Sequence, residues 1–172
     1  MAPLVRVALV HYGVKPGIEH GYSPNSSLLS LGRVPADGEV ARHLEIRGGA
    51  GVLRIERLRM ANDEPVGIET THLALARFPG LAQRMDSTTS TVLERDYGVR
   101  LSAGKETIET IPAPPREAAL LCTEVGCPML LIIRTTRDLA GTPVEYGRSH
   151  YRCERLQLVA DLRPPVTLAN ET

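Results

Sequence analysis

Residues 52–75, VLRIERLRMANDEPVGIETTHLAL, decide the fold that this sequence predicts. Two apolar-rich runs flank residues 61–65, ANDEP. Asparagine followed by aspartate is typical of turns, and proline cannot donate a hydrogen bond inside a central strand. We therefore expect a β-hairpin whose turn lies at residues 61–65.

The first arm of this hairpin carries two arginines where its apolar face would continue. Leu53 and Ile55 share one face of a strand, and the next two positions on that face are Arg57 and Arg59. A guanidinium group binds carboxylate or phosphate through two parallel hydrogen bonds, so two of them can hold a small anion without a metal ion. The alternative is that both reach solvent from an edge strand, where such charges oppose aggregation.

The length and charge of the chain limit what it can be. Its 172 residues are enough for one domain, or for one domain with a tail. A hydrophobic content of 42% and a charged content of 23% are ordinary for a soluble globular protein. Basic and acidic residues balance at 20 each, without a long basic run. We therefore do not expect this chain to bind nucleic acid by itself.

The cysteines indicate a reducing compartment. Cys122, Cys127 and Cys153 form neither a C-x-x-C motif nor a cluster with zinc-site spacing. We expect a cytoplasmic protein without a metal or cofactor, and Cys122 as a small buried apolar residue. The apolar run at residues 4–10 is too short to span a membrane, so we interpret it as a strand or a packed arm.

The remaining chain alternates predicted strands and short helices. Asp37 is placed to cap a helix over residues 39–46, and Pro115 suits the first position of a helix over 116–122. Thr91 and Glu94 have the spacing of a capping box, in a helix that ends at Gly98. The predicted strands are residues 27–34, 101–111, 129–138 and 156–162, with a second hairpin at 143–153.

Two further polar groups accompany these elements. Residues 87–91, STTST, precede a helix, where hydroxyl groups either cap free amide groups or join those amides in holding an anion. The sequence leaves both roles open. On the return arm of the second hairpin, Glu145 and Tyr151 share one face, and Arg148, His150 and Arg152 share the other.

The histidines do not indicate catalysis. The five histidines, His11, His20, His43, His72 and His150, form no nucleophile triad, H-E-x-x-H motif or metal cluster. We expect His72 and His150 to be structural and the chain not to be an enzyme.

Several ordered blocks resemble the UTRA domain, the effector-binding domain of HutC-type, GntR-family bacterial transcription regulators. The blocks are ERLRMANDEPV at 56–66, FPGL at 78–81, LERDYG at 93–98, GCPML at 126–130, RDLAGTPVEY at 137–146 and SHYRCER at 149–155. The resemblance covers roughly residues 27–162. It implies an α+β, chorismate-lyase-like fold, with a mainly antiparallel β-sheet flanked by helices, a ligand cleft and usually a homodimer.

The resemblance also implies a domain plan. Residues 1–26 would be an N-terminal arm or linker, 27–163 the UTRA-like effector-binding domain, and 164–172 a C-terminal tail. Regulators of this type carry a winged helix-turn-helix domain before the effector domain, and residues 1–26 are too short for one. We therefore expect DNA binding only through a domain that this chain does not contain.

In relatives that bind a phosphorylated sugar, matching positions contact the ligand. Carried over, the expected ligand-binding residues are Arg57, Arg59, Glu69, Thr88, Ser90, Glu145 and Tyr151. The expected effector is a small anionic metabolite of the phosphosugar or carboxylate class. Asp63 replaces a glycine and Ser90 replaces an aromatic residue of many relatives, which leaves the pocket size and the ligand open.

The position of Glu69 depends on the hairpin turn. A two-residue loop at Asn62 and Asp63 would pair Arg57 with Ile68 and turn Glu69 to the other face. A bulge or an odd-length loop would reverse that.

Three functions fit the sequence. The leading hypothesis is an effector sensor, coupled to DNA binding in a dimer. The second is a chorismate-lyase-like enzyme, with Glu69 or Glu145 as acid or base. The third is a ligand-independent dimerisation module.

Overall fold

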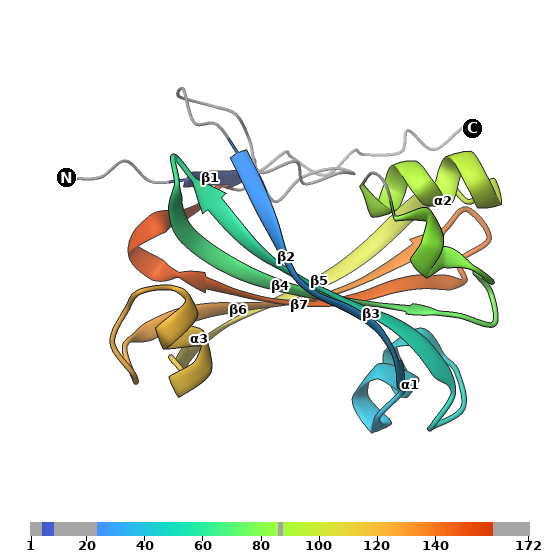
Figure 1. Ribbon diagram of the computed structural model, residues 1–172, viewed down its shortest axis with the longest axis horizontal. Coiled ribbons are helices and arrows are strands. Elements are labelled where there is room, and N and C mark those ends of the chain that lie inside the picture. The colour runs from blue at the N-terminus through green and yellow to red at the C-terminus, as the bar shows by residue number, and fades with distance from the viewer. Residues whose placement is uncertain (1–4, 9–23, 86–87, 160–172) are drawn as a thin grey trace, which may run out of the picture.

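A six-stranded antiparallel sheet forms the centre of the protein (Figure 1). The computed structural model describes residues 5–8, 24–85 and 88–159. The strand order is β2-β3-β4-β7-β6-β5, and β1 pairs with β8 in a separate parallel two-stranded sheet. The strands are β1 (Val5–Ala8), β2 (Pro24–Pro35), β3 (Gly51–Ala61), β4 (Glu64–Ala74), β5 (Leu101–Pro112), β6 (Pro128–Asp138), β7 (Pro143–Arg152) and β8 (Leu156–Val159).

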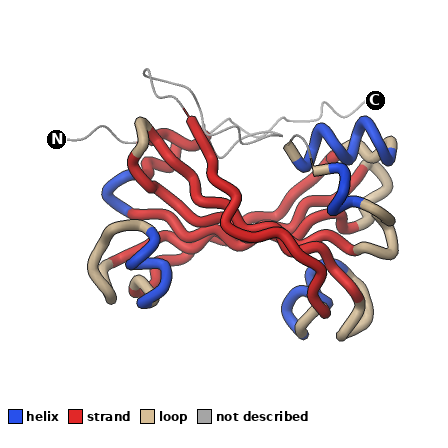
Figure 2. Tube along the Cα trace, viewed as in Figure 1, coloured by secondary structure: helices blue, strands red, loops and turns tan. Residues whose placement is uncertain are grey.

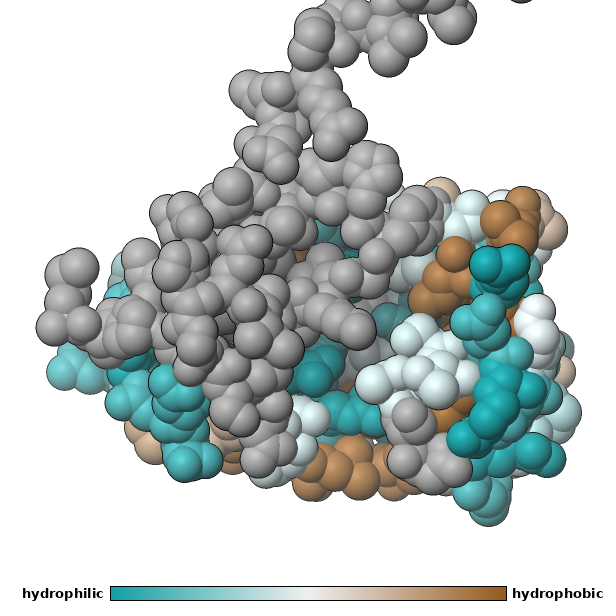
Figure 3. Space-filling view, turned by 90° about the horizontal axis from the view of Figure 1, so that it is seen from above, coloured by the Kyte–Doolittle hydropathy of each residue, from teal (hydrophilic) through white to brown (hydrophobic). Residues whose placement is uncertain are grey.

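The helices cover the two faces of the sheet unequally (Figures 1 and 2). The α2 helix (Thr89–Tyr97) and the 3-10 helix η1 (Leu81–Arg84) lie on one face of the sheet, at one end. We call this face of the sheet the α2 face. Figure 3 views the molecule from that side. The α1 helix (Gly38–Leu44) and the α3 helix (Pro115–Leu120) lie at opposite ends of the other face. A short 3-10 helix, η2 (Cys153–Arg155), follows β7. In the described part of the chain, no helix is long and apolar enough to cross a membrane.

The hairpin of β3 and β4 has the predicted turn and one irregularity. Asn62 and Asp63 both have positive φ, 48° and 63°, as a two-residue turn that matches the twist of antiparallel strands requires. Ala61 faces Glu64, but Arg59 faces Gly67, because Val66 is left unpaired as a bulge. Glu69 therefore lies opposite Arg57, and the register is the one that the bulge alternative predicts.

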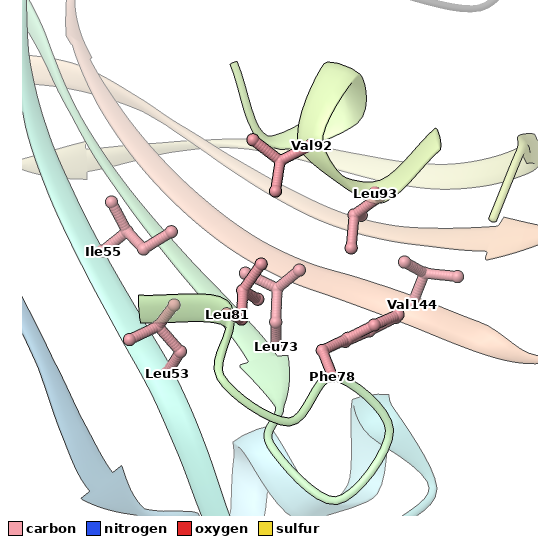
Figure 4. Packing of buried hydrophobic residues seen from close by; sticks show 8 residues of the cluster. All are labelled: Leu53, Ile55, Leu73, Phe78, Leu81, Val92, Leu93 and Val144. Atoms are coloured by element: carbon pink, nitrogen blue, oxygen red, sulfur yellow. The ribbon is translucent and has the colours of Figure 1, made fainter. Parts of the chain in front are cut away.

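Each helix packs on its own apolar cluster. The largest lies under α2 and η1, where buried side chains of three strands meet both helices (Figure 4). Its members are Leu53, Ile55, Leu73, Phe78, Leu81, Val92, Leu93 and Val144. A second cluster under α1 centres on Leu44 and Tyr146, and a third under α3 centres on Leu121 and Met129. Each helix therefore fixes one end of the sheet by apolar burial.

Most predicted elements are confirmed, and two local predictions are wrong. The cap of α2 is Thr88, not Thr91: the Thr88 hydroxyl accepts from the Thr91 amide at 3.3 Å, so the helix begins earlier than the capping-box spacing indicates. Cys122 is exposed, because the chain leaves α3 there with a left-handed backbone, φ 52°. Residues 160–162 of the last predicted strand lie outside the described residues, as do most of residues 1–26.

The Asp37 cap provides a test of how the first helix is held. Its Oδ1 accepts from the Val40 amide at 2.8 Å, and Val40 is buried in the α1 cluster. Asp37→Ala should lower the free energy of unfolding by about 1 kcal/mol in urea denaturation, because the amide loses its partner. Asp37→Asn keeps an acceptor and should remain close to the parent protein. Equal stability of the alanine variant and the parent would contradict this role.

Candidate functional site

A cluster of charged side chains occupies the part of the α2 face beyond the apolar core. On β3 the same face carries buried Leu53 and Ile55 and then Arg57 and Arg59, as the sequence predicts. The β3 strand lies between β2 and β4, so the alternative that both arginines reach solvent from an edge strand is wrong. Figure 3 shows hydrophilic residues near the middle of this side.

Arg59 and Glu69 form an ion pair across the hairpin. The Nε atom of Arg59 donates to Oε2 of Glu69 at 2.6 Å, and a second guanidinium nitrogen contacts the same oxygen. Both side chains remain partly exposed. The Val66 bulge makes this pair possible, because it turns Glu69 to the face of the arginines.

Arg57 is the other arginine of β3 on this face. It is partly buried, and no carboxylate among the residues that the structure describes lies within 4.0 Å of its guanidinium. Burial lowers the pKa of Arg57, and the positive charge of Arg59 lowers it further. The negative charges of Glu69 and Glu145 raise it. A half-buried guanidinium beside another one is a favourable place for an anion.

The structure adds a second ion pair that sequence reasoning missed. Arg134 of β6 donates from Nε to Oε1 of Glu106 of β5 at 2.5 Å. Arg134 faces Gly147 of β7 in the register and so shares the α2 face with Glu145. The sequence signal for this pair is a charged residue, Arg134, directly after Ile133 in a strand predicted to be buried. The sequence does not show which strands lie beside that strand.

Glu145 and Tyr151 complete the cluster from β7. Burial, followed by the neighbouring charge of Glu69, raises the pKa of Glu145 to about 7, although three arginines act against this. Burial and Glu69 also raise the pKa of Tyr151 above its usual range. The Tyr151 ring lies against Gly67, where any Cβ atom would collide with it. Glycine at this position therefore lets the ring lie across β4.

The two hydroxyl residues have no described contact with this cluster. Thr88 caps α2 and bonds to Thr91 Oγ1 at 2.8 Å, and Ser90 Oγ is 3.3 Å from Thr88 Oγ1. Thr88 and Ser90 are exposed, and no described contact joins either to the charged side chains. The structure thus brings together Arg57, Arg59, Glu69, Glu145 and Tyr151, and places Thr88 and Ser90 at the start of the helix on the same face.

The opposite face of the sheet carries histidines and an ion pair to α1. His72 is buried there and stacks on Tyr146, with ring centroids 5.9 Å apart, and burial lowers the pKa of both His72 and His150. Arg148 bonds to Glu39 of α1 at 2.7 Å. Within the described residues, no group of three or more His, Cys, Asp or Glu side chains is arranged to hold a metal ion. The α2 face, which carries Arg57 and Arg59, is therefore the candidate site.

The raised pKa of Glu145 predicts a pH-dependent stability. Between pH 4.5 and about 7 the unfolded chain releases this proton while the folded chain keeps it, so stability should fall as the pH rises and level off above about 7. Glu145→Gln removes this contribution. The variant should gain stability relative to the parent across that window, as measured by urea unfolding at several pH values. Parallel curves for the two proteins would contradict the raised pKa.

Comparison with known proteins gives the family. The family model of the UTRA domain matches residues 19–157. The transcriptional repressor PhnF of Mycolicibacterium smegmatis is 35% identical over 141 residues, which are 81% of this chain and 58% of that protein. The repressor NagR of Bacillus subtilis is 31% identical over 140 residues, with the same two coverages, 81% and 58%. This chain therefore spans little more than half the length of these relatives.

A solved structure agrees with the sequence comparison. The crystal structure of the effector domain of PhnF from Mycobacterium smegmatis superposes with a TM-score of 0.78 at 32% identity, covering 83% of this chain and 89% of that one. The mainly antiparallel α+β fold predicted from the sequence is confirmed by this likeness and by the strand order. The chain belongs to the UTRA family, the effector-binding domains of GntR-family transcription regulators.

Proposed function

We propose that this domain senses a small anionic metabolite, which binds on the α2 face at Arg57 and Arg59. The observation that carries the proposal is the partly buried Arg57, which has a second guanidinium beside it and no carboxylate partner among the described residues. A phosphate or carboxylate can accept two parallel hydrogen bonds from such a group. The relatives named above are repressors, which supports a regulatory rather than an enzymatic role.

The other side chains of the cluster favour an anion that also carries polar groups. Glu69, Glu145 and Tyr151 surround the arginines, and a carboxyl group with a pKa of about 7 can donate or accept a hydrogen bond near neutral pH. Hydroxyl groups of a sugar would match this set, so we propose a phosphosugar or a hydroxylated carboxylate. Thr88 and Ser90 would join the site if α2 moves toward the ligand.

The ion pair of the β3–β4 hairpin can couple ligand binding to a second conformation of the domain. A ligand that takes hydrogen bonds from Arg59 competes with Glu69 for the same donors. Arg59 and Glu69 then have different hydrogen-bond partners with and without ligand. A ligand that binds one of these two arrangements more tightly shifts the population toward it, as regulation requires. We propose that a homodimer of this domain passes the change to a DNA-binding domain outside this chain, and that residues 27–163 form the effector-binding unit.

Thermal unfolding with a ligand panel tests the site. Phosphorylated sugars and hydroxylated carboxylates are compared with their neutral parent compounds. A ligand at 100 times its dissociation constant should add about 2.7 kcal/mol to the free energy of unfolding. Arg57→Ala should remove the response, because the ligand loses its main cation.

The control for this test is Arg47→Ala, which removes an exposed arginine from the loop between α1 and β3. It should leave the response intact. A response that survives Arg57→Ala and Arg59→Ala would contradict the proposed site. If no compound of the panel changes the unfolding temperature, and the protein is a dimer in solution with and without these compounds, the dimerisation module would be favoured instead.

Gly147 offers a steric test that leaves the charges in place. It lies on β7 between Glu145 and Ser149, facing Arg134 on one side and Thr71 on the other. A Cβ atom at Gly147 would meet only a backbone oxygen at 3.7 Å, an ordinary contact. Gly147→Ala should therefore fold normally and still bind. Gly147→Leu should fold but weaken binding at least tenfold in calorimetry, because its side chain fills the floor of the cluster; full affinity would place the ligand elsewhere.

A further inference from the structure

All three cysteines of the chain line one cavity, although Cys153 is distant in the sequence from Cys122 and Cys127. The cavity has a volume of about 510 Å³ and is lined by Cys122, Cys127 and Cys153, together with Thr123 and Glu154. It lies where the end of α3, the start of β6 and the end of β7 meet. Its volume is in the range of small-molecule sites, about 300–1,000 Å³.

Two of the thiols lie at the same end of neighbouring strands. Cys127 directly precedes β6 and Cys153 directly follows β7, and the two strands pair beside them at Met129 and Arg152. Both side chains line the same cavity. Neighbouring strands lie about 4.8 Å apart, so the two thiols can approach each other as a disulfide requires.

The two thiols differ in their surroundings. Thr123 Oγ1 lies 3.2 Å from Cys127 Sγ, so this hydroxyl can donate to a Cys127 thiolate. Burial, Glu154 and Cys127 raise the pKa of Cys153, which keeps that group a thiol. Cys122 is exposed at the rim. The first attack on an oxidant therefore suits Cys127, and Cys153 is placed to react second.

We propose that Cys127 and Cys153 form a reversible intramolecular disulfide on reaction with a small disulfide oxidant admitted to this cavity. The Cys127 thiolate attacks one sulfur of the oxidant, forms a mixed disulfide and releases one thiolate. Cys153 then passes its proton to the released thiolate, and its sulfur attacks the Cys127 sulfur and releases the second small thiolate. Two protein thiols and one disulfide thus become one protein disulfide and two small thiols, with both protons carried by the released thiols.

The test uses the whole chain in its native state with oxidised glutathione as the oxidant. Intact mass should show the loss of two hydrogens, and peptide mapping should join Cys127 to Cys153. Dithiothreitol should restore the original mass. The same treatment in guanidinium chloride is the control, and there the pairing should no longer be selective.

Three serine variants separate the roles. Cys122→Ser should form the disulfide as the parent does. Cys153→Ser should accumulate a glutathione adduct on Cys127, because the second thiol is gone, and Cys127→Ser should form no internal disulfide. A link to Cys122, a link between two chains, or an adduct on Cys122 alone in the native parent would overturn the proposal.

Discussion

The unpaired residue Val66 determines which side chains meet on the α2 face. A regular two-residue turn would give β3 and β4 a register with Glu69 on the far face. With Val66 bulged out, Arg57 lies opposite Glu69, and Arg59 lies opposite Gly67. In the separate pairing of β4 with β7, Gly67 lies opposite Tyr151, where the missing side chain admits the ring. One extra residue therefore assembles a charged cluster that a regular hairpin would divide between two faces.

The cluster also depends on the apolar core beside it. Leu53 and Ile55 anchor α2 at one end of the face, and the arginines begin where the helix cover ends. Glu145 lies opposite Leu73, which is fully buried in that core. The loss of water around this carboxyl group explains why its pKa rises despite three nearby arginines. The charged cluster and the apolar core thus share one face of the sheet.

The sequence predicts the elements of the fold better than their pairing. Alternation and turn residues locate the β3–β4 hairpin, the Asp37 cap and the end of α2 at Gly98, because these depend on residues close in the chain. The bulge was one of two open alternatives, since composition does not distinguish them. Arg134 and Glu106 were missed because they meet only through the order of β5, β6 and β7. Cys122 was misplaced because burial was inferred from residue type alone.

The end of β7 connects the charged cluster with the cavity that the cysteines line. Successive residues of this strand point to opposite faces, so Tyr151 lies in the charged cluster while Arg152 points toward α3. Nη1 of Arg152 donates to the carbonyl oxygens of Leu121 at 3.3 Å and Pro65 at 3.4 Å, which joins the end of α3 to the β3–β4 hairpin. Cys153 follows directly and lines the thiol cavity. A disulfide at Cys153 would restrain the residue next to this three-way contact, and a ligand at Tyr151 would act on the residue before it. Because both act on one short stretch of backbone, oxidation of the thiols and binding of the anion are expected to be thermodynamically linked, and by reciprocity each must change the equilibrium of the other by the same factor.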